Sequence, residues 1–226
     1  MGIIGTIPQG LIVSCQAKPG SPLRNPQVMA AMAQAAEVGG AIGIRANGAE
    51  DIAAIRVLVK LPVIGINKVV HDGYDVFITP TLESARQVAA AGADIIAMDA
   101  TLRSRPDGLT IREAIQLYKK ELGLPIMADI STLEEGLAAA EVGADIVATT
   151  LSGYTPYSPQ QEAPDFTLIA ELAARIQTPI IAEGRFASPA DARRALDLGA
   201  HAVVVGTAIT AVDWVTQRYV RALCAN

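Results

Sequence analysis

The sequence predicts a (β/α)8 barrel, in which eight parallel strands alternate with helices. Three observations support this fold. An Ala-rich helix end followed by glycine and an apolar strand occurs four times, a proline opens an apolar strand three times, and the two patterns alternate along the chain. The chain has 226 residues, and one such barrel commonly occupies about 250. We therefore expect residues 1–226 to form a single domain.

Glycine follows each predicted helix of the first pattern. The four glycines precede the apolar segments GAIGIR, IIAMD, IVATT and AVVVG, and they are separated by 53, 51 and 56 residues, which suits two strand–helix units per repeat. A helix that stops and turns into a strand often needs a left-handed residue at its end, and glycine adopts this conformation readily. We expect that conformation at Gly39, Gly92, Gly143 and Gly199.

Proline opens each strand of the second pattern, at Pro62, Pro125 and Pro179. Proline has no N–H group, so it is tolerated at the first residue of a strand, and it also ends the preceding helix. Together with the apolar segment Gly10–Gln16, the two patterns predict strands that begin near residues 10, 40, 61, 94, 125, 145, 179 and 201. Helical periodicity appears between them at 82–91, 111–122, 133–142, 168–176 and 189–198.

An open, doubly wound sheet has the same alternation of strands and helices, and periodicity alone does not exclude it. No GxGxxG motif follows the first strand, however, so the usual dinucleotide-binding motif of that fold is missing. Hydrophobic residues make up 51% of the chain and aromatic residues 4%. This composition suits strands that are covered by helices on one face and packed against each other on the other.

The net charge limits the kinds of binding partner that we expect, and the cysteine content indicates the cellular compartment. The formal net charge is −5, so no broad basic surface is expected for nucleic acid or for an anionic membrane. No apolar segment reaches the ~18 residues that a membrane span needs. Cys15 and Cys224 form no CxxC motif, which indicates reduced thiols in a cytoplasmic protein.

Polar residues end nearly every predicted strand. In β/α barrels the active site lies at the carboxyl ends of the strands, where the loops converge. One polar strand end alone is often simple solvation, but a whole rim of them predicts a ligand site. The strand-end residues are Gln16, Arg45, Lys68, Asp99, Asp129, Thr149, Thr150, Glu183, Arg185, Gly206 and Thr207.

Lys68 and Glu183 are the candidate catalytic residues. Lys68 follows an apolar strand, so we expect its amine in a water-poor mouth, where burial and the nearby Arg45 lower its pKa toward that of a general base. A carboxylate facing it suits proton transfer at a carbon next to a carbonyl. The alternatives are an ion pair of Lys68 with Asp129 or Glu183, and a Glu183 that only balances the charge of Arg45, Lys68 or Arg185.

The loops after the last two strands predict a phosphate site. Glycine lets backbone N–H groups approach an anion, and Arg185 adds charged donors, so Gly184, Arg185, Gly206 and Thr207 are candidate ligands. The loop at 152–159, with Ser152 and Gly153, is long enough to close over a ligand, and an ordered surface turn is the alternative. Since the two histidines have no spaced partners, we expect chemistry without a metal and assign no cofactor.

Seven stretches of the chain, in order, resemble the N-acylglucosamine-6-phosphate 2-epimerases, also called N-acetylmannosamine-6-phosphate 2-epimerases. The resemblance spans practically the entire chain. The stretches are LIVSCQ at 11–16, GIRANG at 43–48, GINK at 65–68, FITPT at 77–81, DAT at 99–101, MADIS at 127–131 and AEGR at 182–185.

This resemblance implies an isomerase that converts N-acetylmannosamine 6-phosphate to N-acetylglucosamine 6-phosphate in sialic acid catabolism. It also implies a TIM barrel of the ribulose-phosphate-binding type that assembles as a homodimer. The catalytic lysine and glutamate of the family correspond to Lys68 and Glu183. Residues matching positions that hold the sugar are Gln16, Arg45 and Asp129, and those matching the phosphate end are Arg185, Gly206 and the loop with Ser152 and Gly153.

Two other functions remain open from the sequence. One is a lyase in which Lys68 forms a Schiff base with a phosphorylated keto acid, and the other is a phosphosugar-binding protein without catalysis. The last predicted helix, 212–223, has apolar residues at near-helical spacing. They fit an interface between two copies of the chain, or packing on the barrel exterior.

Overall fold

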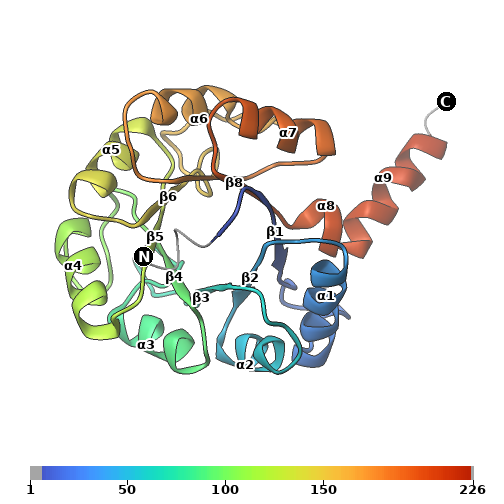
Figure 1. The fold of residues 1–226 in the computed structure, drawn as a ribbon, viewed down its shortest axis with the longest axis horizontal. Coiled ribbons are helices and arrows are strands. Elements are labelled where there is room, and N and C mark those ends of the chain that lie inside the picture. The colour runs from blue at the N-terminus through green and yellow to red at the C-terminus, as the bar shows by residue number, and fades with distance from the viewer. Residues whose placement is uncertain (1–6, 225–226) are drawn as a thin grey trace.

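Eight parallel strands close into a barrel in the computed structural model, which describes residues 7–224 (Figure 1). Each strand pairs with the next in sequence, and β8 pairs with β1. The barrel is therefore confirmed, and an open sheet is excluded. The strands are β1 (Gly10–Cys15), β2 (Gly43–Asn47), β3 (Val63–Ile66), β4 (Ile95–Asp99), β5 (Ile126–Asp129), β6 (Ile146–Ala148), β7 (Ile180–Glu183) and β8 (Ala202–Val205).

Seven helices alternate with the strands and form the outer ring in Figure 1, and two more follow β8. The short helix α8 follows β8 directly, and α9 projects away from the ring (Figure 1). The helices are α1 (Pro26–Val38), α2 (Ala49–Leu58), α3 (Leu82–Ala90), α4 (Ile111–Leu122), α5 (Leu133–Glu141), α6 (Phe166–Ala173), α7 (Pro189–Asp197), α8 (Thr207–Thr210) and α9 (Val212–Cys224).

Three of the four expected glycines have the left-handed conformation, and one does not. Gly92, Gly143 and Gly199 have φ values of 102°, 94° and 102°. Gly39 has a φ of −73° and still donates its N–H to Ala35 of α1, so the left-handed residue is Gly40, with φ 90°. Because the chain turns one residue later there, β2 begins at Gly43, later than the predicted residue 40.

The core has two layers that follow the alternation of side chains along each strand. Ile12, Ile64, Ile95 and Met127 belong to one buried cluster of strand residues, which fills the barrel interior. Their sequence neighbours in the strands, such as Val63 and Ile96, pack in a second cluster with residues of the helices. Residues of one parity therefore face the interior and residues of the other face the helices.

Acidic residues at two strand starts tie the amino end of the barrel together. The carboxylate of Asp94 accepts the backbone N–H of Val63, and that of Asp145 accepts the N–H of Ile126, each at 2.9 Å. Asp145 also pairs with Lys119 at 2.8 Å. These charges satisfy the first backbone groups of neighbouring strands, at the end opposite the strand-end residues singled out above.

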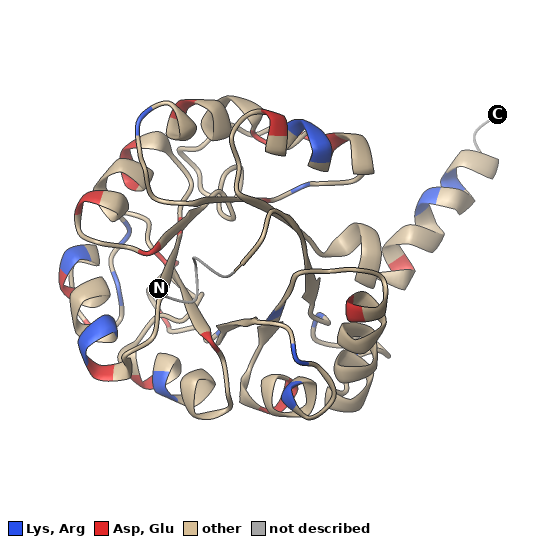
Figure 2. Cartoon of the chain, in the orientation of Figure 1, with Lys and Arg blue, Asp and Glu red and all other residues tan. Residues whose placement is uncertain are grey.

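Charges of both signs are interspersed over the outer helices in Figure 2. This view shows no face that carries positive charge alone. Within residues 7–224, none of the helices combines the length and the apolar character that crossing a membrane requires.

Gly65 provides a test of how tightly the helices pack on β3. A Cβ atom at this position would lie 2.6 Å from the Cβ of Ala93 and 3.1 Å from the side chain of Ile52. Gly65→Ala should therefore lower the free energy of unfolding by roughly 1–3 kcal/mol in urea titrations. Gly43→Ala is the matched control, because its nearest neighbours lie at 3.4 Å. An equal effect of both substitutions would contradict this packing argument.

Candidate active site

The candidate site residues continue the interior register of their strands. Arg45 on β2, Asp129 on β5 and Glu183 on β7 have the parity of the interior residues Gly43, Met127 and Ile181. Lys68 and Thr150 extend the same parity beyond the ends of β3 and β6. Side chains of five different strands are thus directed to one mouth of the barrel, at its carboxyl end.

Arg45 forms the centre of this site. Its side chain is 1% exposed, and its guanidinium contacts Asp129 through Nη2 at 2.5 Å and Nη1 at 3.1 Å. Nη1 also donates to Oε2 of Glu183 at 2.7 Å. A buried cation is tolerated only with such counter-charges. Glu183 therefore does balance the charge of Arg45, which was one of the expected alternatives.

Lys68 is held by its backbone while its amine is left without a close carboxylate. Its N–H donates to Oδ1 of Asn47 at 2.8 Å, and the residue pairs with Ile78 across a short antiparallel bridge. Thr79, next to Ile78, has a left-handed φ of 47° and accepts the N–H of Asn67. Among the residues that the structure describes, Lys68 forms no ion pair within 4.0 Å. The expected ion pair with Asp129 or Glu183 is absent there.

The pKa of Lys68 is lowered from its ordinary value. The main cause is enclosure by the surrounding rim, and the positive charge of Arg45 acts in the same direction, against the carboxylates of Glu183 and Asp129. Lys68 is nevertheless solvent-exposed, so the expected water-poor environment is incomplete without a ligand over the mouth.

Burial raises the pKa of Glu183 to about 6, and the neighbouring charge of Asp129 acts in the same direction. Arg45, the hydroxyl of Thr150 and Lys68 oppose this increase. A carboxyl group with such a pKa can both take up and release a proton near neutral pH.

The sequence placed Thr150 among the polar strand-end residues without giving it a role, and it did not identify Asn47 as a site residue. The hydroxyl of Thr150 lies 2.7 Å from Asp129 Oδ1 and 3.1 Å from Glu183 Oε2. Thr150 does follow β6 with interior parity, so the register of the strand was the signal that could have identified it. The contact of Asn47 with the backbone of Lys68 joins two strand ends, which no local pattern indicates.

Arg185 connects the loops after β6 and β7. Its Nε donates to the carbonyl of Ala163 at 2.8 Å and its Nη1 to the carbonyl of Ser152 at 2.5 Å. The guanidinium also lies over the ring of Tyr154, 5.5 Å from its centroid. Gly153 has a left-handed φ of 78°, and a Cβ there would displace the guanidinium of Arg185, so this position favours glycine.

The loop after β6 uses much of its polar capacity internally. The hydroxyl of Ser152 donates to Asp165 at 2.7 Å, and the N–H of Gly153 donates to Ser158 at 2.8 Å. Ser152 and Gly153 therefore reach a ligand only after these contacts are exchanged. Their assignment to the substrate stays a prediction.

The remaining candidates lie around β1 and β8. Gln16 donates to the hydroxyl of Ser14 at 2.8 Å, and a Cβ on Gly206 would lie 3.1 Å from Cβ of the same serine. Thr207 is exposed and begins α8, whose first N–H groups have no acceptor inside the helix. Gly184, with φ 111°, continues from Glu183 on the adjacent strand.

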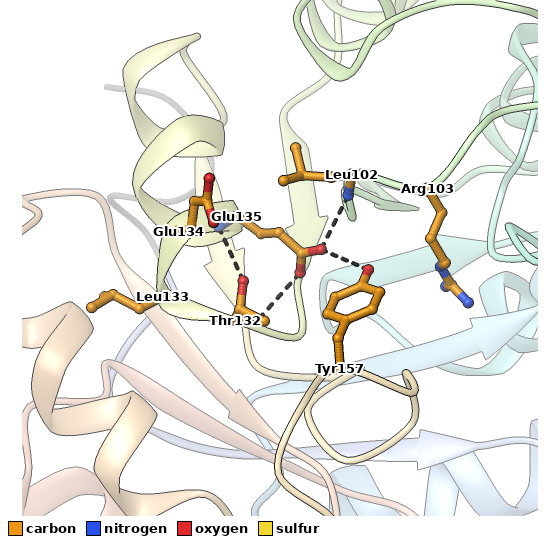
Figure 3. Close-up of a pocket in the computed structure, with 7 residues that line it drawn as sticks. All are labelled: Leu102, Arg103, Thr132, Leu133, Glu134, Glu135 and Tyr157. Atoms are coloured by element: carbon orange, nitrogen blue, oxygen red, sulfur yellow. Dashed lines mark hydrogen bonds between the residues drawn. The ribbon is translucent and has the colours of Figure 1, made fainter.

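A cavity of about 670 Å³ lies beside this mouth, between the loops after β4, β5 and β6 (Figure 3). Figure 3 shows Leu102 and Tyr157 converging on Glu135, a carboxylate that is 1% exposed and accepts their N–H and O–H groups. None of the candidate catalytic or substrate residues lines it. Arg103, which lines this cavity, pairs with Asp99 at the end of β4, at 2.6 Å.

Metal-binding capacity is limited in the part of the chain that is described. Between residues 7 and 224, no three His, Cys, Asp or Glu side chains are grouped so that they could hold a metal ion.

Comparison with known proteins gives consistent matches. Residues 29–225 match the model of the NanE family, provisionally described as N-acetylmannosamine-6-phosphate epimerases. A protein from Caldanaerobacter subterraneus subsp. tengcongensis is 53% identical over 97% of this chain and 93% of its own length. One from Thermosynechococcus vestitus is 50% identical over 100% of this chain and 98% of its own. Both have the provisional name N-acetylmannosamine-6-phosphate 2-epimerase.

A solved structure is similar over nearly the whole chain. It is the N-acetylmannosamine-6-phosphate 2-epimerase from Clostridium perfringens, for which a structural and biochemical characterization is described. The two chains are 43% identical and superpose with a TM-score of 0.94, covering 98% of this chain and 96% of the other.

The raised pKa of Glu183 predicts a contribution to stability that depends on pH. Its pKa rises from 4.5 to about 6 on folding, so the proton is bound more tightly in the folded state. This contribution is complete below pH 4.5 and is lost as the pH rises through 6. At 1.36 kcal/mol per pKa unit the loss is about 2 kcal/mol.

Glu183→Gln removes the titration and provides the reference. Urea unfolding of both proteins from about pH 4 to about pH 7 should show the unsubstituted protein losing about 2 kcal/mol relative to the variant. A difference that stays constant over this range would contradict the raised pKa.

Proposed function

This chain belongs to the N-acetylmannosamine-6-phosphate epimerase family, and we propose that it interconverts N-acetylmannosamine 6-phosphate and N-acetylglucosamine 6-phosphate. The two sugars differ only in configuration at C2, so the protein is an isomerase that removes and returns the proton at that carbon. The observation that carries this proposal is the meeting of Lys68 and Glu183 around Arg45 and Asp129 at one mouth of the barrel.

The reaction requires a base next to a carbonyl group. In the open-chain sugar C1 is an aldehyde, so when the C2–H bond breaks its electrons delocalise onto the C1 oxygen. Lys68 takes this proton, and a proton then returns to the opposite face of C2. A neutral amine is needed for the first step, and the lowered pKa of Lys68 increases the fraction that is neutral. A substrate over the mouth excludes more water and lowers the pKa further.

Glu183 exchanges protons with the substrate oxygens during this cycle. Negative charge develops on the C1 oxygen when the C2 proton leaves, and an acid near its own pKa stabilises that charge by donating a proton or hydrogen bond. The pKa of Glu183, about 6, permits both protonation states at neutral pH. The carboxyl therefore acts as the partner of Lys68 in each direction of the reaction.

Arg45, Asp129 and Gln16 hold the sugar in this proposal. Within residues 7–224, Nε of Arg45 is buried and has no hydrogen-bond partner. An unsatisfied buried donor is costly, and a sugar oxygen would satisfy it. Gln16 follows β1 with the parity of the interior residues, and because its amide nitrogen donates to Ser14, its amide oxygen is left for a sugar hydroxyl.

The phosphate is assigned to the loops after β7 and β8. Gly206 and Thr207 offer backbone N–H groups at the start of α8, and Gly184 offers one after β7; the loops after these two strands are a common phosphate position in barrels. Arg185 already uses Nε and Nη1 on the loop after β6, which leaves Nη2 for the anion. Phosphate binding at Arg185 would then also order Ser152 and Gly153.

We further propose that the protein is a homodimer in which α9 lies at the interface. None of the residues of α9 is buried, and Tyr219, Val220 and Leu223 are 70%, 52% and 85% exposed. This finding disfavours packing of α9 on its own barrel, the alternative expected from the sequence. The helix α9 projects from the ring (Figure 1), and its exposed apolar residues are typical of an interaction surface. A second copy of the chain offers an equivalent apolar face against which they can be buried.

We also propose that the protein is cytoplasmic and that residues 1–226 form a single catalytic domain. Cys15 is buried and free, and Cys224 is free and exposed. Unpaired thiols are typical of a reducing compartment.

Lys68→Met tests the catalytic assignment. We expect loss of epimerisation and of hydrogen exchange at C2 in D2O, because the base is removed, while affinity for the phosphosugar is retained within about threefold. Proton NMR follows both reactions, and calorimetry measures binding. Lys60→Met, an exposed lysine at the opposite end of β3, is the matched control and should remain fully active.

Normal exchange of the C2 hydrogen in Lys68→Met would refute this role of the lysine. Borohydride reduction in the presence of substrate separates the epimerase from a Schiff-base lyase, because only the lyase acquires a covalent adduct. A protein that binds the phosphosugar without any turnover would be a binding protein instead.

Sedimentation tests the dimer. The unsubstituted protein should sediment at twice the chain mass of 23.5 kDa, and Val220→Asp combined with Leu223→Asp should shift it toward one chain, because charges are then buried at the interface. Val57→Asp, on the exposed side of α2, should leave the mass unchanged. A monomeric unsubstituted protein would disprove the proposal.

A further inference from the structure

Thr150 places one hydroxyl group between the two carboxylates of the site. Its Oγ1 lies 2.7 Å from Asp129 Oδ1 and 3.1 Å from Glu183 Oε2. Nη1 of Arg45 reaches the same two oxygens, at 3.1 and 2.7 Å, and lies 3.5 Å from the hydroxyl. Four polar groups from β2, β5, β7 and the end of β6 therefore share a small volume.

A hydroxyl group has one hydrogen to donate and lone pairs that accept. An ionised carboxylate only accepts, so the hydrogen of Thr150 can serve Asp129 or Glu183, or be shared between them. If Glu183 binds a proton, its O–H can donate to Thr150, which in turn donates to Asp129. The hydroxyl thus offers Glu183 a partner in both protonation states, and a buried carboxyl needs such a partner in each.

The charged groups that face Glu183 are otherwise held in place. Arg45 approaches from β2, Asp129 from β5 and Lys68 from the end of β3. On the other side, β8 presents the apolar Val204 in register with Glu183. Arg45 is fixed by its two contacts with Asp129, so it cannot turn when Glu183 changes its charge. A hydroxyl hydrogen can turn, because only one bond rotates.

The neighbouring Thr149 contacts the backbone of Glu183, whereas Thr150 contacts its carboxyl group. Its hydroxyl donates to the backbone carbonyl of Glu183 at 2.9 Å and accepts the backbone N–H of Glu183 at 3.0 Å. Thr149 thus joins β6 to the backbone of β7. Within residues 7–224, the hydroxyl of Thr150 instead contacts side-chain atoms, those of Asp129, Glu183 and Arg45.

We propose that Thr150 is a positioning residue that sets the proton balance of Glu183 by pairing with this carboxyl group in both of its protonation states. Threonine suits this task because its β-branch restricts rotation about χ1 and holds the oxygen between the two carboxylates. The proposal rests on the proposed function for the role of Glu183 in catalysis. The hydrogen-bonding claim itself concerns the protein without substrate.

The experiment removes the hydroxyl and follows the carboxyl directly. Infrared difference spectra against pH, with Glu183→Gln in each background to identify the signal, give the pKa of Glu183 in the free protein. Thr150→Val should raise this pKa by roughly half a unit to one unit, because the hydrogen bond that Thr150 donates to the ionised carboxylate is stronger than the one it accepts from the neutral carboxyl group. Thr150→Ser should restore the original value. Thr110→Val, which removes an equivalent hydroxyl from the exposed cap of α4, should leave the pKa unchanged.

The pH dependence of kcat/KM for the epimerisation is the second measurement. The limb due to Glu183 should move by the same amount in Thr150→Val and return in Thr150→Ser. If Thr150→Val does not fold, as judged by circular dichroism, Thr150→Ala removes the same hydroxyl and should give the same shift. No shift in a folded variant, or an equal shift in Thr150→Ser, would overturn the proposal.

These outcomes are separable from those that test the function. If the unsubstituted protein does not epimerise the sugar phosphate, the proposed function fails, while the infrared titration still decides the role of Thr150. If epimerisation is observed and the titration shows no shift, the claim for Thr150 fails alone.

Discussion

A fully buried guanidinium in the mouth of the barrel is the constraint on which the site depends. Arg45 is 1% exposed and continues the interior face of β2, so its charge must be compensated inside the protein. Asp129 supplies two contacts and Glu183 a third. Because these carboxylates come from β5 and β7, compensation of Arg45 also fixes three strand ends relative to one another.

The pairing of Arg45 with Asp129 and Glu183 affects the ion pairs and the pKa values of the other charged groups at the mouth. Since Asp129 and Glu183 are engaged with Arg45, neither forms a close ion pair with Lys68 in the described residues. Enclosure by the rim and the charge of Arg45 lower the pKa of the lysine, while burial raises that of Glu183 to about 6. Enclosure at the mouth therefore moves a base and an acid toward the same pH range, which proton transfer at C2 requires, whereas Arg45 lowers the pKa of both groups.

The loops above the mouth are tied to this arrangement by two further groups. Arg185 holds the carbonyls of Ser152 and Ala163 from the side of β7. Glu135 holds Tyr157 from the side of β5 and the N–H of Leu102 from the loop after β4. The loop after β6 is thus anchored at both sides, which places Thr150 at a fixed start of an ordered loop.

The order of the strands and their polar ends, which include Arg45, Lys68 and Glu183, were determined by the sequence alone. These features depend on local patterns, such as Gly92 or Pro125 at an element boundary and alternation along a strand. Where the chain turns at Gly40 instead of Gly39, the local pattern offered two adjacent glycines, and the contacts of α1 decided between them.

Only the tertiary structure decided which groups pair. The sequence left open whether Asp129 and Glu183 bind Lys68 or Arg45, because both cations end strands and the distance between side chains depends on barrel closure. It named Thr150 only as a polar strand end and did not indicate its carboxylate partners, which lie 21 and 33 residues away. Hydrogen bonds depend on ångström-scale distances between atoms of different strands, and no periodicity within one strand contains that information.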